Sequence, residues 1–336
     1  MIKTQLSVVV PIYSGSQYVQ ELFQRIKTVR EQWEQEEAPL ALGELIFVDD
    51  QSIDNSLPVL QKISEENQWV HALSLSRNFG QHPATIAGIL HSSGNWVITL
   101  DEDLQHPPEK IEQLLYKAIK EEKDVVYANP QNGPHGKVSR DFTSSYFKKM
   151  MVWLTGDKHI AYFNSFRLMR GEIARSAASV CGPDTYFDVS LTWFTQAIGQ
   201  VSLEIQDQRM AENNKSGYSF LKLIEHARRL ILSSKINLYR SIAFLGILIF
   251  FVGVLYSGFI IFNEIMHPGK FGSRGWPSLI ITTMIFGATS IILLSIILEY
   301  LSLVVLKAQG KPVFFVINRS APAELLTYLE KRNGRH

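Results

Sequence analysis

The chain reads Trp96-Val97-Ile98-Thr99-Leu100-Asp101-Glu102-Asp103 at the point where a short apolar run meets an acidic one. We expect a buried strand whose carboxyl end carries both aspartates into a crevice. Hard divalent cations take oxygen ligands and keep coordination positions for substrate phosphates, so Asp101 and Asp103 are candidate ligands for Mg²⁺ or Mn²⁺. The alternative is an ordinary acidic turn without a function, and the neighbouring segments decide between the two.

Similar apolar runs recur along the first 130 residues and alternate with helical patterns. We predict strands over 6–12, 44–48, 70–75, 96–100 and 124–128, and helices over 18–34, 56–67, 83–92 and 108–122. Nearly continuous apolar strands joined by helices indicate an α/β fold with a mostly parallel sheet and helices on both faces. Ligands of such sheets bind beyond the carboxyl ends of the strands, which is where the acidic run lies.

Polar residues also follow the first two predicted strands. The clusters are Pro11-Ile12-Tyr13 and Asp49-Asp50-Gln51-Ser52, and a solvated turn is the alternative for the two aspartates. No Gly-x-Gly-x-x-Gly follows the first strand and no Gly-x-x-x-x-Gly-Lys-Ser/Thr occurs, so the sequence lacks both glycine-rich phosphate-binding loops. A bound diphosphate is therefore expected to be held through a metal.

Composition narrows the class of protein. A net charge of +1 over 336 residues gives no argument for a nucleic-acid partner, because such proteins usually carry a basic face or domain. The single cysteine, Cys181, excludes an intramolecular disulfide and fits a reducing compartment. Met1-Ile2-Lys3-Thr4-Gln5 runs directly into the first strand, so we expect no signal peptide.

Two long stretches, 241–262 and 276–298, contain no charged side chain. Each is long enough to cross about 30 Å of hydrocarbon as a helix, and a pair of buried core helices is the alternative. Basic residues flank the pair: Arg228, Arg229, Lys235 and Arg240 precede it, and Lys307, Lys311 and Arg319 follow it. Because Lys and Arg favour the cytoplasmic side, we predict a transmembrane hairpin with both ends in the cytoplasm.

These patterns divide the chain into an N-terminal domain over 1–235, a membrane domain over 236–306 and a tail over 307–336. Amphipathic patterns over 142–155 and 218–235 predict helices that lie in the membrane interface, with ordinary core helices as the alternative. The tail is predicted to contain a strand over 311–317 and a helix over 323–331. Since a lone strand needs a partner, we expect it to pair with the N-terminal domain or with a neighbouring subunit in a homo-oligomer.

Four stretches, in this order, resemble the consecutive motifs of family 2 glycosyltransferases. They are Val8-Val9-Val10-Pro11-Ile12-Tyr13, Phe47-Val48-Asp49-Asp50-Gln51-Ser52, Leu75-Ser76-Arg77-Asn78-Phe79-Gly80 and Asp101-Glu102-Asp103-Leu104-Gln105-His106-Pro107-Pro108-Glu109. The order resembles most closely the polyprenyl-phosphate glycosyltransferases, relatives of dolichyl-phosphate mannose synthase, and extends over nearly the whole chain because that group also carries interfacial helices and two C-terminal transmembrane helices.

The resemblance implies a GT-A-type α/β domain that transfers one sugar, with inversion, from a nucleotide-sugar to a polyprenyl phosphate of the undecaprenyl or dolichyl type. It implies an integral protein of the plasma (inner) membrane of a bacterium, with the catalytic domain in the cytoplasm. A processive polysaccharide synthase would need more spans and usually a Gln-x-x-Arg-Trp motif, which is absent. A non-catalytic, nucleotide-sugar-binding membrane subunit is the alternative from another class.

The resemblance also implies roles for individual residues. Contacts to a UDP-, GDP- or dTDP-sugar are expected from Pro11, Tyr13, Asp49, Asp50 and Ser52, while Arg77 and Asn78 either orient its phosphates or cap the exit of the third strand. Mg²⁺ or Mn²⁺ is expected at Asp101, Asp103 and Gln105, the two aspartates being the catalytic residues. The lipid phosphate is expected near Lys137, Arg140, Arg209, Lys215, Ser216 and Tyr218. A plain basic collar at the membrane is the alternative for Arg209 and Lys215.

The chain departs from the group in two places. Many members have Gly-Asp where this chain has Asn164-Ser165, so a catalytic carboxylate cannot be assigned there. A general base is not essential, because the second pKa of a phosphate monoester is about 6 and the acceptor is therefore largely dianionic at neutral pH. In the last motif, Arg209 lies two positions too far upstream and Asn214 replaces a glycine.

The sequence does not predict a zinc site, because His82 and His106 lack the spacing of one.

Overall fold

The computed structural model describes residues 3–130, 158–182, 185–203, 276–308, 312–318 and 323–333, and the single positions 152, 255, 258, 259, 262, 265–267 and 310. The chain forms two compact units. The first consists of Met1–Ser144, His159–Tyr218 and Pro312–His336, and the second of Ser145–Lys158 and Ser219–Lys311. The predicted interfacial helices, 218–235 entirely and 142–155 except for position 152, lie outside the described residues, as does most of the predicted span 241–262.

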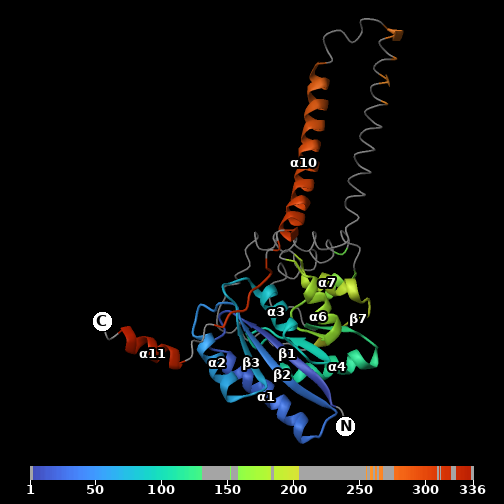
Figure 1. Cartoon of the computed structure of the whole chain (residues 1–336). Coiled ribbons are helices and arrows are strands. Elements are labelled where there is room, and N and C mark those ends of the chain that lie inside the picture. Colours follow the sequence, from blue (N-terminus) through green and yellow to red (C-terminus); the bar gives the residue numbers. More distant parts are fainter. Residues whose placement is uncertain are drawn as a thin grey trace. The chain divides into compact units, whose positions relative to one another are not determined.

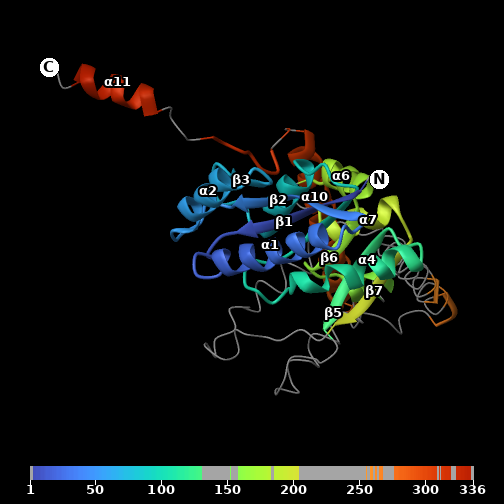
Figure 2. The same ribbon diagram turned by 90° about the horizontal axis from the view of Figure 1, so that it is seen from below.

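A seven-stranded sheet forms the centre of the first unit (Figure 1 and Figure 2). Its strands are β1 (Thr4–Ile12), β2 (Leu40–Asp49), β3 (Val70–Ser74), β4 (Trp96–Thr99), β5 (Val125–Pro130), β6 (Arg167–Arg170) and β7 (Ile198–Leu203), in the order β3-β2-β1-β4-β6-β5-β7. Strands β3, β2, β1 and β4 are parallel, and β6 is antiparallel to both of its neighbours. The prediction of an α/β fold with a mostly parallel sheet is confirmed.

All four predicted helices of this region are present. They are α1 (Val19–Gln35), α2 (Ser56–Glu66), α3 (Gln81–Leu90) and α4 (Ile111–Lys120), the last preceded by a short 3₁₀ turn, η1 (Pro108–Lys110). The sequence prediction missed β6, β7 and three helical elements, η2 (Lys158–Tyr162), α6 (Gly171–Val180) and α7 (Phe187–Phe194). These are short, and short apolar segments carry too little periodicity to be told apart from loops.

The apolar side chains of β1 show why both faces of the sheet are covered. Val8, Val9 and Val10 are consecutive and none has exposed surface. Since neighbouring side chains of a strand point to opposite faces, Val8 and Val10 pack in the core with α1, α2 and α4, while Val9 faces α3. The approach of α3 is close at Gly88, where an added Cβ would lie 2.3 Å from a Val9 methyl group.

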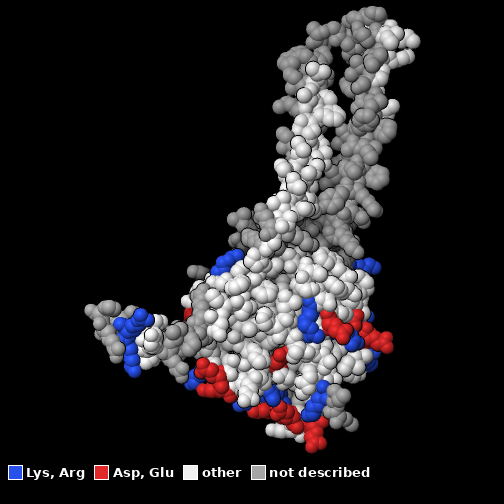
Figure 3. Space-filling model, viewed as in Figure 1, with Lys and Arg blue, Asp and Glu red and all other residues white. Residues whose placement is uncertain are grey.

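Helix α1 shows the separation of an apolar face from a charged one. Leu22, Phe23 and Ile26 are buried at helical spacing, whereas Lys27–Glu31 and Arg30–Glu34 form ion pairs one turn apart. On the face drawn in Figure 3, acidic and basic side chains of the domain lie beside one another. Exposed pairs of this kind contribute only about 0.3–0.5 kcal/mol each, so burial of the apolar stripe is what holds the helix.

The order of the strands changes direction at β1. The chain proceeds from β1 outward through β2 to β3 and then returns to the other side of β1 with β4. Helices following strands on the two sides of such a switch point diverge, which leaves room for a ligand beyond the carboxyl ends of the strands. The segments after β1, β2 and β4 therefore border one place.

Glu44 joins neighbouring segments of the sheet away from the carboxyl ends of the strands. Its carboxylate accepts hydrogen bonds from the Ser7 hydroxyl at 2.6 Å and from the Ser93 amide and hydroxyl at 2.6 and 3.0 Å. Burial raises the pKa of the Glu44 carboxyl, but these donors outweigh burial and hold the pKa below its ordinary value. The ionised form is therefore the one that joins β1, β2 and the segment before β4.

We expect Glu44→Gln to destabilise the protein at pH 7 and to cost progressively less as the pH falls below about 4, the ordinary range of a glutamate. A depressed pKa contributes stability that is present above the pKa of the unfolded chain and is lost as the pH falls through that of the folded protein. Urea unfolding of both proteins between pH 3 and pH 7 measures the difference. A difference that stayed constant over this range would contradict the assignment.

A helix occupies the second predicted apolar stretch. Helix α10 (Trp276–Ala308) includes the whole of 276–298 and extends further. Within the described residues, however, no helix has the combination of length and apolar character that crossing a membrane requires. The transmembrane hairpin thus stays a prediction.

The tail contributes a strand-like segment and helix α11 (Ala323–Asn333). Val316 lies opposite Leu75 in an antiparallel bridge, next to the last residue of β3. Of the two partners predicted for this segment, the structure shows the N-terminal domain of the same chain. Pairing with a neighbouring subunit stays an untested prediction.

Candidate active site

The sheet brings the predicted donor-side residues to one edge. Asp49 is the last residue of β2 and lies opposite Ile12 in β1 and Ser74 in β3, while Asp101 follows β4 closely. Val9 of β1 pairs with Thr99 of β4, so the loops after these strands leave the sheet at the same level. The predicted convergence of Tyr13, Asp49 and Asp101 on one edge is confirmed.

Asp49 and Asp50 are buried, with 0% and 3% of their surface exposed, so the alternative of a solvated turn is wrong. Asp49 accepts the Ser52 amide at 3.0 Å and the Ser74 hydroxyl at 3.2 Å. It thereby joins the turn after β2 to the end of β3. Ser52, a predicted nucleotide contact, is held in place by this bond.

Asp50 holds the loop that precedes α3. Its carboxylate accepts the amides of Phe79 at 2.7 Å and Gly80 at 2.8 Å. Burial raises the pKa of the Asp50 carboxyl, and the two amide donors offset only part of that rise. Gly80 has φ +98°, a left-handed conformation that a side chain disfavours, which explains a glycine at this position.

Arg77 and Asn78 lie on the surface of the same loop. The Arg77 guanidinium carbon lies 3.9 Å from the centre of the Phe79 ring, and a guanidinium nitrogen donates to the Asn78 carbonyl at 3.2 Å. Both predicted roles, orienting phosphates and capping the exit of β3, are compatible with this position. The charge of Arg77 remains accessible from solvent because its side chain is exposed.

Asp101 is oriented by neutral donors from two other segments. Gln81 Nε2 donates to Oδ1 and the Ser165 hydroxyl donates to Oδ2, each at 2.6 Å. The Asp101 amide donates to His106 Nδ1 at 2.9 Å, and His106 Nε2 lies 3.7 Å from Asp101 Oδ2. The His106 ring stacks on Phe166 at 4.9 Å. Ser165, at the position where the resemblance suggested a carboxylate, instead supports the carboxylate of Asp101.

Glu102 was not predicted as a site residue. Its carboxylate accepts the Tyr13 amide at 2.8 Å and the Ser14 amide at 3.2 Å, which ties the loop after β1 to the loop after β4. A Cβ at Gly15 would lie 2.7 Å from a Glu102 oxygen, so glycine permits this approach. The side chain of Tyr13 is 40% exposed at this edge, whereas Pro11 is buried. The only sequence signal for Glu102 was its place between the two aspartates.

Asp103 begins a constrained turn. It is 8% exposed, and its Oδ1 accepts the Gln105 amide at 3.2 Å. Leu104 between them is buried at φ +62°, and Gln51 after the β2 aspartates has φ +56°. A left-handed conformation in a residue other than glycine costs about 1 kcal/mol or more and tends to occur at functional sites. Both acidic loops of this edge contain one.

The donor set of Asp101, Asp103 and Gln105 fits a hard divalent cation, because all three side chains offer oxygen. Within the described part of the chain, no group of three or more His, Cys, Asp or Glu residues is arranged to hold a metal ion. A cation bound by the two aspartates and Gln105 would complete its shell with substrate phosphates and water, as Mg²⁺ commonly does.

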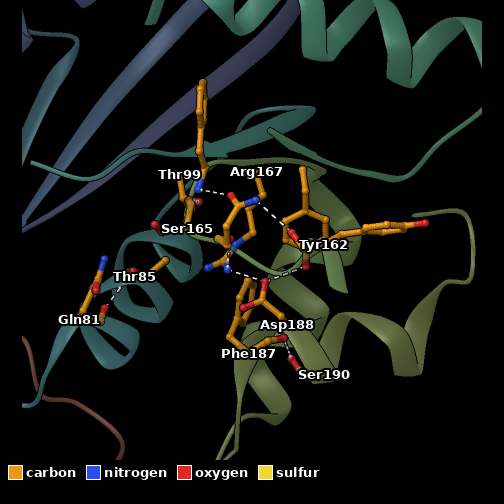
Figure 4. A network of polar contacts seen from close by, with 12 residues as sticks. Gln81, Thr85, Thr99, Tyr162, Ser165, Arg167, Phe187, Asp188 and Ser190 are labelled. Carbon is orange, nitrogen blue, oxygen red and sulfur yellow. Dashed lines mark hydrogen bonds and ion pairs between the residues drawn. The ribbon is translucent and has the colours of Figure 1, made fainter. Parts of the chain in front are cut away.

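A buried polar network supports the Asn164-Ser165 loop from below (Figure 4). Arg167 is 3% exposed and Asp188 is 1% exposed, and the two form an ion pair at 2.5 Å. Arg167 also donates to the Asn164 carbonyl at 3.2 Å, and the Thr99 hydroxyl donates to the Ser165 carbonyl at 2.5 Å. The loop that presents Ser165 to Asp101 is thus fixed from β4 and from β6.

Tyr127 completes this network. Its hydroxyl donates to the Asp188 carboxylate at 2.7 Å. Burial, and after it the negative charge of Asp188, raise the pKa of Tyr127 well above its ordinary value, so the hydroxyl stays protonated. Burial disfavours the charge of Arg167, but Asp188 outweighs burial and the pKa of Arg167 is raised. Nothing in the sequence indicated Asp188 as the partner of Arg167.

The six residues predicted at the lipid phosphate lie outside the described part of the chain. They are Lys137, Arg140, Arg209, Lys215, Ser216 and Tyr218. Their roles stay predictions.

We expect Ser165→Ala to lower kcat of the sugar transfer that the resemblance implies by roughly 10- to 100-fold, the worth of one hydrogen bond to a charged group. The Asp101 carboxylate would lose the donor that fixes Oδ2, while the fold would keep its core. Steady-state rates and the melting temperature of the two proteins measure the effect. Ser179→Ala, which removes an exposed serine hydroxyl of α6, is the matched control. An unchanged rate in Ser165→Ala would show that this donor does not position Asp101.

Comparison with known proteins shows the family of the chain. A family model described as glycosyl transferase family 2 matches residues 7–176, which is about half of the chain and includes every loop described above except the C-terminal part of the buried network. The chain belongs to glycosyl transferase family 2. This glycosyltransferase accordingly uses a nucleotide-sugar donor, and the acidic edge of its sheet is the candidate active site.

Full-length relatives of this glycosyltransferase include two bacterial proteins. The uncharacterized glycosyltransferase YkcC of Bacillus subtilis is 27% identical over 313 residues, which cover 93% of each chain. The uncharacterized glycosyltransferase sll0501 of Synechocystis sp. is 28% identical, over 93% of this chain and 94% of its own. Similarity thus extends well beyond the family 2 domain.

Two solved structures share the general arrangement at low similarity. Glucosyl-3-phosphoglycerate synthase from Mycobacterium tuberculosis, in complex with Mn²⁺ and UDP-glucose, has a TM-score of 0.48 and 15% identity over 69% of this chain and 77% of its own. TarS of S. aureus, residues 1–349, has a TM-score of 0.45 and 16% identity over 82% of this chain and 78% of its own.

Proposed function

We propose that this glycosyltransferase transfers a single sugar from a nucleotide-sugar to a polyprenyl phosphate at the cytoplasmic face of a bacterial plasma membrane, with inversion at the anomeric carbon. The part of the proposal that concerns the nucleotide-sugar donor rests on the convergence of Asp49, Asp50, Asp101 and Asp103 on one edge of the sheet. The acceptor half rests on the two uncharged stretches 241–262 and 276–298 with basic residues outside them. Stretches of this kind are typical of membrane spans.

The donor is proposed to lie across the carboxyl ends of β1, β2 and β4. Its base and ribose would contact Tyr13 and the turn of Asp49 to Ser52, with Pro11 beneath them. Carboxylate oxygens accept hydrogen bonds from base N–H groups and ribose hydroxyls, and Asp residues suit this task. Because Asp49 and Asp50 also hold their own loops, they present the site in a fixed shape before the donor arrives.

The diphosphate is proposed to lie beside Asp101, Asp103 and Gln105. A divalent cation held there would neutralise charge that develops on the departing diphosphate. Gln81 and Ser165 keep the Asp101 carboxylate oriented toward this place, and Arg77 offers a positive charge from the neighbouring loop. The protein thus contributes mainly position and electrostatic stabilisation.

The acceptor phosphate is proposed to attack the anomeric carbon directly. Its second pKa is about 6, so a dianion is available at neutral pH without a protein base. This agrees with Ser165 at the position where many members of the resembled group have a carboxylate, since Ser165 donates to Asp101 and offers no base. Basic side chains among Lys137, Arg140, Arg209 and Lys215 would hold the phosphate near the sugar.

Incubation of the purified chain with polyprenyl phosphate and labelled UDP-, GDP- or dTDP-sugars tests the proposal. We expect a lipid-linked monosaccharide whose formation stops when EDTA is added and resumes with excess Mg²⁺ or Mn²⁺. A polymer would indicate a processive synthase, and no product with any donor would indicate a non-catalytic subunit. Equal rates with and without the chelator would contradict the cation site.

A further inference from the structure

The C-terminal segment 312–318 pairs with the exit of β3. The Ser76 amide donates to the Phe315 carbonyl at 2.9 Å, and the Ile317 amide donates to the Ser74 carbonyl at 2.9 Å. Between these bonds, Leu75 lies opposite Val316. The segment is separated from β3 by more than 230 residues of sequence and follows α10 directly.

Ser74 and Leu75, which lie beside the C-terminal segment, also form hydrogen bonds to Asp49, a predicted nucleotide contact. The Ser74 hydroxyl donates to Asp49 Oδ2 at 3.2 Å, and the Leu75 amide donates to the Asp49 carbonyl at 2.8 Å. A few residues later, Asp50 accepts the amides of Phe79 and Gly80. Residues 74–80 are therefore held between Asp49 and Asp50 at the end of β2 and the C-terminal segment.

The position of this pairing distinguishes it from ordinary protection of a sheet edge. β3 is the outermost strand beside β2, and proteins often cover such an edge to prevent association. Among the described residues, the bonds to the C-terminal segment are made at the last residue of β3 and the two residues after it. They fall at the end of the strand where a donor would bind, and not along Val70 to Leu73.

We propose that segment 312–318 is a positioning element of the donor site, which fixes residues 74–80 and thereby the orientation of Asp49 and the Arg77 loop toward a nucleoside diphosphate. The inference rests on the proposed function, because it assumes that the donor lies at this edge. It adds that the end of the chain, outside the residues matched by the family 2 model, determines donor affinity. Preorganisation of this kind acts on binding more than on the chemical step.

Ile317→Pro tests the proposal because proline lacks the amide that donates to Ser74. Phe315→Ala is the matched control, since it removes a side chain that is 56% exposed but keeps the carbonyl that accepts from Ser76. Val316→Asp is a second variant, which places a charge opposite buried Leu75 without changing the backbone. Calorimetric titration of the full chains with UDP, GDP and dTDP in the presence of Mg²⁺ gives Kd, and hydrogen exchange reports the Ser76 amide.

We expect Kd of the preferred diphosphate to rise about ten-fold in Ile317→Pro and Val316→Asp, equivalent to about 1.4 kcal/mol, and to stay unchanged in Phe315→Ala. The Ser76 amide should lose protection in the first two variants alone, while kcat at saturating donor stays near that of the wild type. Loss of this protection with unchanged Kd would overturn the inference. If the wild type bound none of the three diphosphates, the donor assignment itself would be wrong and the inference would fall with it.

Discussion

Asp103→Asn is expected to lower kcat of sugar transfer by about 10²–10³-fold or more while leaving the fold intact, comparable to removal of a group that stabilises charge in a transition state. Asp103 is the more buried member of the acidic pair after β4 and lies in a turn fixed by the left-handed conformation of Leu104. Asparagine keeps an oxygen for the Gln105 amide and nearly the same volume, but it removes the negative charge that a divalent cation requires.

Two measurements separate loss of charge from loss of structure in this variant. Mn²⁺ binding, followed by electron paramagnetic resonance in the presence of UDP, should weaken in Asp103→Asn, and the melting temperature should stay close to that of the wild type. Glu121→Gln is the control, because Glu121 carries the same charge on the exposed surface just after α4, where it pairs with Lys117. Full activity of Asp103→Asn would refute the assignment of Asp103 to a cation.

Arg167→Met is expected to lower the free energy of unfolding by about 3–5 kcal/mol, the cost of leaving a buried charge without its partner. Asp188, at 1% exposure, would keep the hydroxyl of Tyr127 as a donor but lose the guanidinium that balances its charge. In the wild type, Arg167 Nε is buried without a hydrogen-bond partner, so burial of the guanidinium costs free energy. The attraction between Arg167 and Asp188 offsets this cost only while both charges are present.

A double-mutant cycle tests this interpretation. Arg167→Met combined with Asp188→Asn removes both charges, and we expect it to recover at least half of the stability lost in Arg167→Met alone. Chemical denaturation of the four proteins gives the interaction energy. Additive losses in the double variant would show that the two side chains contribute through packing and separate hydrogen bonds, and that the ion pair itself contributes little.

The strands and helices of residues 4–120 could be predicted from the sequence because each has a strong local pattern. β1 contains consecutive apolar residues, which predicts a strand buried on both faces. α1 repeats apolar residues at helical spacing, which predicts a helix buried on one face. The region after residue 130 was harder. β6 has four residues and α7 has eight, and their positions depend on pairing with distant strands and helices that no local pattern encodes.

The residues of the candidate site likewise include some that the sequence predicted and some that it did not. Asp49, Asp50, Asp101 and Asp103 were predictable, because polar residues directly after parallel strands must emerge at one edge. Glu102, Gln81, Ser165 and Asp188 were not predicted, because each acts on a residue brought close only by folding. Ser165 shows the difference clearly: the sequence indicated that a carboxylate was missing there, whereas the structure shows a hydroxyl that orients Asp101.

The sequence alone determined the four parallel strands β1 to β4 of this glycosyltransferase and the acidic residues at the carboxyl ends of β2 and β4, since apolar runs and strand ends are properties of neighbouring residues. The tertiary structure decided what those acidic residues touch: Gln81 and Ser165 at Asp101, the loop after β1 at Glu102, and the far C-terminal segment at the exit of β3. These contacts join residues tens to hundreds of positions apart. Hydrogen bonds of this kind depend on distance and direction in space, and only the packed chain fixes both.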